Sequence, residues 1–206
     1  MGAVVYHLDA VDEHAHDPGR RTLPTRTRRG RGAACAPSPA PRPTAAPAIV
    51  GLNRIDVTAK GAQGGITIAR AVLGARRLTV DATTNINPPG AKGVVLTDGA
   101  VLTTDPAVVG SAGSAGDVVV KGTRGTGTGA AVAVRAATIQ SGRDVLLAAP
   151  RPGDDACLES ATLIAHEGLG IIDFVGVRGT VFVDDMTVLQ GRLRGAERVS
   201  DASCPP

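Results

Sequence analysis

Residues 134–149, VRAATIQSGRDVLLAA, contain the pattern that decides the expected fold. An alternating apolar stretch leads into a small-x-apolar triplet, and a corner that contains Gly142 then separates the triplet from another apolar run. The same order recurs in four further segments: ITIARAVLGARRLTV from Ile66, VVLTDGAVLTTD from Val94 with DVVV from Asp117, LESATLIAHEGLGIIDF from Leu158, and VFVDDMTVLQGRLRG from Val181. Self-similar units of this kind predict a repeat fold in which each unit stacks on its neighbours.

The triplets align the five copies with one another. They are Ala71-Val72-Leu73, Ala100-Val101-Leu102, Ala137-Thr138-Ile139, Ala161-Thr162-Leu163 and Met186-Thr187-Val188. Their spacings are 29, 37, 24 and 25 residues, and the longest contains the insertion GSAGSAG at 110–116. Such units are too short for βαβ crossovers, whereas three short strands with tight corners use roughly 20–25 residues. The sequence therefore predicts an all-β fold, a single-stranded parallel β-helix (β-solenoid) of about five rungs.

Stacked rungs place equivalent apolar side chains in inward columns. The predicted columns are Ile68, Leu96, Val134, Leu158 and Val183 on one face, and Leu73, Leu102, Ile139, Leu163 and Val188 on the next. The segment GLNRIDVTAKG at 51–61 matches only the last third of a unit, so we expect it to open the stack as a half-turn. An antiparallel β-sandwich is the alternative fold, because short strands at even spacing also suit it.

The composition favours a narrow aliphatic interior. The 206 residues include 27 Gly and 14 Pro but no Trp, one Tyr and two Phe, while 43% of the residues are apolar. Globular cores usually take much of their buried area from aromatic rings, which this chain cannot supply. Stacked β-branched and aliphatic side chains suit the composition better than a two-layer core does.

Three regions are predicted along the chain. Residues 1–48 are rich in Pro and Arg with few large apolar side chains, which predicts disorder. Residues 49–195 form the expected repeat domain, and the polar segment 196–206 is expected to cap its last rung. Seven of the 22 basic and four of the 19 acidic residues lie in the first region, so the remainder carries fifteen of each. The basic excess is thus confined to the first region, and no specific nucleic-acid partner is expected.

The repeats, with VRAATIQSGRDVLLAA as the clearest copy, resemble those of bacterial right-handed parallel β-helix proteins, especially filamentous-haemagglutinin-like adhesins and autotransporter passengers. The similarity covers about 49–194. It implies secretion and attachment at the cell surface, with surface glycans or proteins as partners. The first residues, MGAVVYHLDAVDEHAHD, lack the basic and apolar regions of a secretory signal, and no run is long enough to predict a transmembrane segment.

Acidic residues in the last two repeats are the candidates for catalysis. They are Asp154, Asp155, Glu159, Asp173, Asp184 and Asp185. Glycoside hydrolysis needs two carboxylates about 5–10 Å apart on one face, and stacked rungs can supply that separation. Paired acids are equally typical of exposed corners, and Phe174 and Phe182 are the only rings in the domain. No catalytic centre is therefore identified.

Histidine and cysteine provide weaker signals. A metal site is considered at His14, His16 and Asp12, although ligands on an unstructured segment bind loosely. His166 has the chemistry of an acid or base but is more typical of a solvated turn. The cysteines, Cys35, Cys157 and Cys204, have no metal-like spacing, and a bond between Cys157 and Cys204 is possible in an oxidising compartment. No cofactor is expected.

Three functions remain open at this point. The leading prediction is a non-catalytic structural or adhesive β-helix segment of an exported bacterial surface protein. The first alternative is a carbohydrate-active enzyme, a polysaccharide lyase or glycoside hydrolase, built on the same scaffold. The second is an intracellular scaffold that associates end to end, because an uncapped terminal rung invites strand addition.

Overall fold

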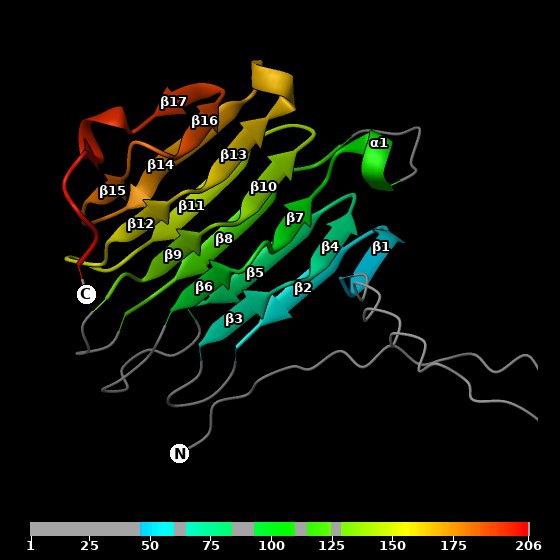
Figure 1. Cartoon of the computed structure of the whole chain (residues 1–206), viewed down its shortest axis with the longest axis horizontal. Coiled ribbons are helices and arrows are strands. Elements are labelled where there is room, and N and C mark those ends of the chain that lie inside the picture. Colours follow the sequence, from blue (N-terminus) through cyan, green and yellow to red (C-terminus); the bar gives the residue numbers. More distant parts are fainter. Residues whose placement is uncertain (1–45, 60–64, 84–92, 110–114, 125–128, 206) are drawn as a thin grey trace, which may run out of the picture.

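The computed structural model describes residues 46–59, 65–83, 93–109, 115–124 and 129–205. Short strands dominate these residues, and each strand lies beside strands of the neighbouring repeats (Figure 1). The segment expected to be disordered, residues 1–48, lies outside the described ranges except at its last residues, where the first strand begins at Ala48.

The strands form three parallel sheets of six strands each. Sheet A contains β1 (Ala48–Leu52), β4 (Val72–Ala75), β7 (Val101–Thr103), β10 (Thr138–Ser141), β13 (Thr162–Ala165) and β16 (Val188–Gln190). Sheet B contains β2 (Ile55–Thr58), β5 (Leu78–Ala82), β8 (Val118–Gly122), β11 (Val145–Ala149), β14 (Ile171–Val177) and β17 (Arg192–Arg194). Sheet C contains β3 (Ile66–Ala69), β6 (Val94–Thr97), β9 (Val132–Arg135), β12 (Ala156–Glu159), β15 (Val181–Val183) and β18 (Val199–Ser200).

The chain visits sheets A, B and C in turn and then returns to A, so every three strands complete one coil. This winding is consistent with the expected β-solenoid. Six strands per sheet exceed the expected five rungs, because the segment expected to be a half-turn is part of a complete first coil, β1 to β3. The last coil ends with β18, which lies beyond residue 195, where the repeat domain was expected to end.

Three short helical turns interrupt the strands in the described ranges. Helix α1 (Pro106–Val109) follows β7 and lies against β1 and β4 of sheet A. Its buried Val109 approaches Gly74 of β4, where an added Cβ would come within 3.2 Å of the Val109 Cγ1 atom. The 3₁₀ turns η1 (His166–Gly168) and η2 (Ala196–Arg198) lie at corners of the last two coils.

Inward side chains stack like on like through the coils. The column Ile68, Leu96, Val134, Leu158 and Val183 is confirmed, since each member is the register partner of the next. Buried columns in the other sheets follow the same rule, and Val118 pairs with both Leu78 and Val145 in sheet B. Because side chains alternate along a strand, this register places every second residue inside the coil.

The second predicted column is correct in four coils and wrong in the last. Leu163 pairs with Leu189, whereas Val188 pairs with Thr162 and is 51% exposed. The cause is the corner between β15 and β16, where residues 184–187 replace the three residues 159–161 of the preceding coil. Thr187, not Met186, therefore takes the place of the small residue Ala161, and Met186 is 69% exposed.

The corner between sheets C and A has a shared backbone conformation. Non-glycine residues with positive φ occupy it in four coils: Arg70 (53°), Asp98 (54°), Ala136 (46°) and Ser160 (50°). The Gly99 N–H donates to the Ala136 carbonyl, and the Ala136 N–H donates to the Glu159 carbonyl, both at 2.8 Å. The hydrogen-bond ladder thus continues through the corner, which offsets the cost of the left-handed conformation.

Leu163→Ala is predicted to lower the free energy of unfolding by about 2–5 kcal/mol, because it leaves a cavity in a fully buried column. Val188→Ala should change it by less than about 1 kcal/mol, since Val188 faces solvent. Urea unfolding of both variants measures the difference. Equal losses would contradict the register in which Leu189 continues the column.

Candidate functional site

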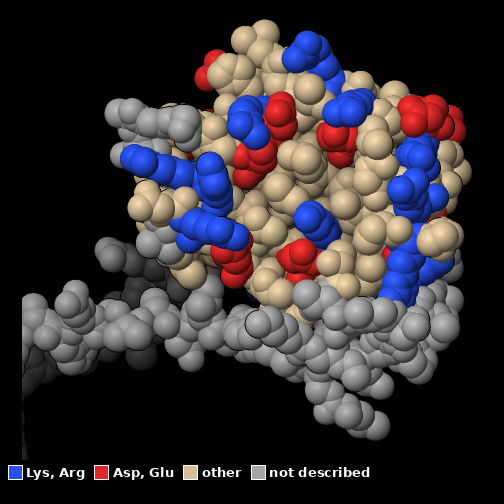
Figure 2. Space-filling model, turned by 180° about the vertical axis from the view of Figure 1, so that it is seen from behind, with Lys and Arg blue, Asp and Glu red and all other residues tan. Residues whose placement is uncertain are grey.

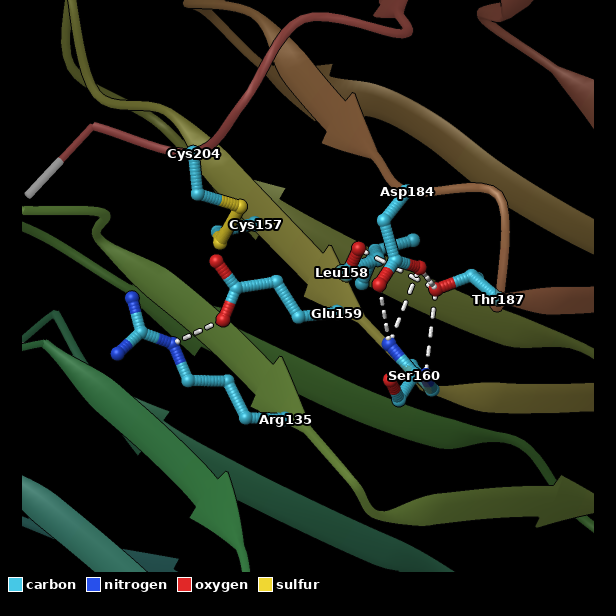
Figure 3. Close-up of a disulfide and its surroundings, with 9 residues drawn as sticks. Arg135, Cys157, Leu158, Glu159, Ser160, Asp184, Thr187 and Cys204 are labelled. Carbon is cyan, nitrogen blue, oxygen red and sulfur yellow. Dashed lines mark hydrogen bonds and ion pairs between the residues drawn. A yellow bond between two sulfur atoms is a disulfide. The ribbon is translucent and has the colours of Figure 1, made fainter.

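Asp184 lies at the widened corner after β15 and completes the hydrogen-bond ladder there. Its two carboxylate oxygens accept the backbone N–H of Ser160 at 3.0 and 2.9 Å, and the Thr187 hydroxyl donates to Oδ1 at 2.6 Å (Figure 3). In the preceding coil, the equivalent N–H of Ala136 donates to a backbone carbonyl. The Thr187 and Ser160 hydrogen bonds lower the pKa of Asp184, so this acid stays ionised. An ionised carboxylate cannot serve as the general acid of a hydrolase.

Asp154 and Asp155 lie at the corner between sheets B and C, before β12. Asp155 accepts the Thr180 N–H at 2.8 Å. Asp154 is 3% exposed, and its Oδ1 atom accepts the Arg124 N–H at 3.2 Å. Its Oδ2 atom is buried without a hydrogen-bond partner. Burial raises the pKa of Asp154, because a charged carboxylate is poorly solvated there, although the Arg124 N–H partly opposes this rise.

The remaining candidate acids lie elsewhere on the coil. Glu159, at the end of β12, forms an ion pair with Arg135 at 3.0 Å. Asp173, on β14, accepts the Val175 N–H at 2.8 Å, and its carboxylate lies 3.6 Å from the Arg194 guanidinium. The Asp185 side chain is exposed.

These positions divide the six candidate acids into three groups. Asp154 and Asp155 lie at one corner, Asp173 lies on sheet B, and Glu159, Asp184 and Asp185 lie around the corner between sheets C and A. Within the last group, Figure 3 shows the Glu159 carboxylate directed toward Arg135 and the Asp184 carboxylate directed toward Ser160. Each of these two carboxylates therefore has a partner within the coil.

The other residues considered for chemistry also have structural surroundings. The His166 Nδ1 atom lies 2.9 Å from the Gly142 carbonyl, and His166 has a φ of 44° at an exposed turn. Phe174 is fully buried in the core and is not accessible to a sugar, whereas Phe182 is partly exposed. His14, His16 and Asp12 lie outside the described residues.

A disulfide joins Cys157 of β12 to Cys204, which follows the last strand (Figure 3). Their Cα atoms are 5.7 Å apart, and 47 residues separate them in the sequence. The bond considered from the sequence is thus present. It returns the end of the chain from the sixth coil to the fourth. Closing a loop of this size contributes about 2–4 kcal/mol in the chain-entropy estimate.

Cys157, Cys204 and Glu159 are the one group in the described ranges whose ligand atoms lie close enough together, within 4.8 Å, to suggest a metal. The two sulfur atoms are bonded to one another and offer no thiolate. This group is therefore a covalent tie and not a metal centre in the oxidised protein. Within the described part of the chain, no helix combines the length and apolarity needed to span a membrane.

The chain matches no protein-family model, and comparisons with curated proteins and with solved structures also yield no match. Its function is therefore argued from the residues and their geometry.

Asp154→Asn is predicted to raise the melting temperature at pH 7. The pKa of Asp154 is raised in the folded state, so the folded protein binds the proton of this carboxyl more tightly than the unfolded chain does. The ionised carboxylate then destabilises the fold increasingly as pH rises from 3.8 through the folded-state pKa. A neutral amide that still accepts the Arg124 N–H avoids this loss.

The advantage of the Asn variant should become small toward pH 3.5, where the wild-type carboxyl is mostly protonated in both states. Melting curves of the two proteins from about pH 3.5 to 7 measure this pattern. Asp185→Asn is the matched control, because it removes the same charge from an exposed position. A constant difference between wild type and the Asp154 variant across this range would contradict the assignment.

Proposed function

We propose that the chain is a non-catalytic structural or adhesive β-helix segment of an exported bacterial surface protein, whose outer surfaces contact glycans or proteins. The observation that supports this most directly is the use of carboxylates as corner hydrogen-bond acceptors. Asp184, Asp155 and Asp173 each accept a backbone N–H, so they maintain the coil instead of facing a substrate.

The disulfide supports export. Disulfides persist in oxidising compartments and are rare where glutathione and thioredoxin keep thiols reduced. Cys157 is fully buried and bonded to Cys204, so the bond is part of the folded structure. A covalent tie at the last coils suits a protein that must keep its fold outside the cell.

The outer faces of the three sheets are the surfaces available for contact. A solenoid packs its inward columns into the core and presents each outward column as a regular row of side chains. Corner segments add further contacts. This division supports a display or binding role, because inward residues determine the fold and outward residues are free to vary.

The purified chain is expected to release no product from polygalacturonate or from other acidic polysaccharides. Reducing-end and unsaturated-uronate assays measure hydrolysis and elimination respectively. Asp173 and Asp184, whose carboxylates accept backbone N–H groups, are the residues to test if any product forms. Turnover that Asp184→Asn or Asp173→Asn abolishes, while both variants keep the wild-type melting temperature, would replace the structural proposal with the enzyme.

A further inference from the structure

The corner between sheets B and C carries an arginine in each of three successive coils. Arg124 follows β8, Arg151 follows β11 and Arg178 follows β14. Figure 2 shows Lys and Arg side chains at both lateral edges of the face seen from behind, with Asp and Glu side chains among them. Adjacent coils of a parallel sheet are about 4.8 Å apart, so the corner presents roughly one cationic group per coil step.

The Arg124 side chain is held in place by backbone carbonyls. Its Nη1 and Nη2 atoms donate to the carbonyls of Gly129 at 2.7 Å and Gly153 at 2.9 Å. Both partners are neutral, and three of the five guanidinium N–H donors remain for another acceptor. Elsewhere arginines face carboxylates directly, as Arg135 faces Glu159.

Arg178 is the most accessible member of the row. Its side chain is exposed, and no residue in the described ranges forms a hydrogen bond or ion pair with its guanidinium. Its backbone N–H donates to the Ala149 carbonyl at 2.9 Å, which fixes the residue to the coil below. The backbone hydrogen bond to Ala149 therefore positions Arg178, and its guanidinium is exposed to solvent.

The acids of this corner are turned toward the backbone. Asp154 is 3% exposed, with its Oδ1 atom on the Arg124 N–H, and the Asp155 Oδ1 atom accepts the Thr180 N–H. These contacts direct carboxylate oxygens toward the coil, while the Arg178 guanidinium remains at the surface. Asp154 lies close enough to Arg124 and Arg151 to interact with them electrostatically, so the cationic character of the outer edge depends mainly on Arg178.

Small side chains border the arginine row on sheet B. Lys121, Ala148 and Gly176 are register partners in successive strands, in the outward column next to the corner. Lys121, whose other register partner is Asp81, adds a fourth cation at the end of this column. The Ala and Gly positions leave the strand backbone open to close approach. The result is a shallow strip with a cationic edge that runs along the coil axis.

We propose that this strip, Lys121, Arg124, Arg151 and Arg178 with the floor at Ala148 and Gly176, binds a linear polyuronate lying along the coil axis. A polyuronate carries one carboxylate per sugar, which suits one guanidinium per coil. Arginine matches a carboxylate through two parallel N–H donors. This inference names the class of ligand for the proposed adhesive function, and it rests on that proposed function.

A nucleic acid fits the strip less well. Single strands are bound by aromatic side chains that stack on bases, and no aromatic residue belongs to the strip. Duplex recognition uses an element that enters a groove, whereas this strip is a corner beside a flat sheet. Carboxylated sugars need neither feature.

The test is binding of a fluorescently labelled hexagalacturonate, followed by anisotropy at several salt concentrations, to the full chain. Affinity should fall as salt rises, because the contacts are ionic. Arg178→Ala should weaken binding by about tenfold, the usual loss for one charge-assisted pair. Arg76→Ala is the matched control: Arg76 is exposed at the opposite edge of sheet B, and its removal changes the net charge equally. It should change the affinity by less than about twofold.

Each other outcome overturns a defined part of the account. Equal losses in the two variants would replace the strip with diffuse charge attraction. Equally tight binding of monomeric galacturonate would exclude a site that spans several coils, and equally tight binding of duplex DNA or dextran sulfate would exclude carboxylate selectivity. Absence of binding would remove the strip but leave the structural function standing. Cleavage of the hexamer would instead overturn the non-catalytic function.

Discussion

The hydrogen-bond ladder between successive coils is the constraint on which the rest of the structure depends. A strand in an inner coil forms hydrogen bonds with a strand on each side. Both neighbouring strands therefore fix its direction and its register. Ile139, for example, is the register partner of Leu102 and of Leu163, and all three side chains are fully buried. Because side chains alternate along a strand, a one-residue slip would turn this apolar column toward water. Aliphatic residues of similar size at equivalent positions therefore stabilise both the ladder and the core, without large aromatic side chains.

The ladder also explains the chemistry of the corners. Where coils have equal length, backbone carbonyls receive the corner N–H groups, as Glu159 does for Ala136. Where a corner is longer or changes direction, a side-chain carboxylate accepts the corner N–H instead. Asp184 accepts the Ser160 N–H, and Asp144 accepts the Ile171 N–H at 2.7 Å. Acidic residues that resemble a hydrolase pair in the sequence are thus ladder components in space. Arg178 in contrast presents its side chain to solvent, and the proposed binding of an anionic polymer depends on it and its neighbours.

The sequence predicted the coil well because the fold depends on a local period that repeats. Alternation and small corner residues were enough to identify the columns through Ile68 and Leu163, and the pairing of the two domain cysteines was among the possibilities considered. The register at Val188 was wrong because an extra corner residue leaves the apolar pattern almost unchanged, and only the ladder shows which residue faces inward. The arginine row was missed for a similar reason. Arg124 and Arg178 are far apart in the sequence, and the unequal loop lengths between them conceal that they share a corner.

Disulfide trapping between neighbouring coils tests the parallel coil and its register most directly. Thr138 and Thr162 are register partners on the outer side of sheet A, 24 residues apart in sequence, so their Cα atoms lie at the spacing of adjacent strands, about 4.8 Å. In a Cys35→Ser background, Thr138→Cys with Thr162→Cys should oxidise rapidly to an intramolecular disulfide, because that spacing suits the bond. Thr138→Cys with Ile164→Cys, displaced by two residues to about 8 Å, should not. Preferential bonding of the first pair is the predicted result. Failure of that pair to form, or equal bonding of both pairs, would contradict the parallel coil and its register.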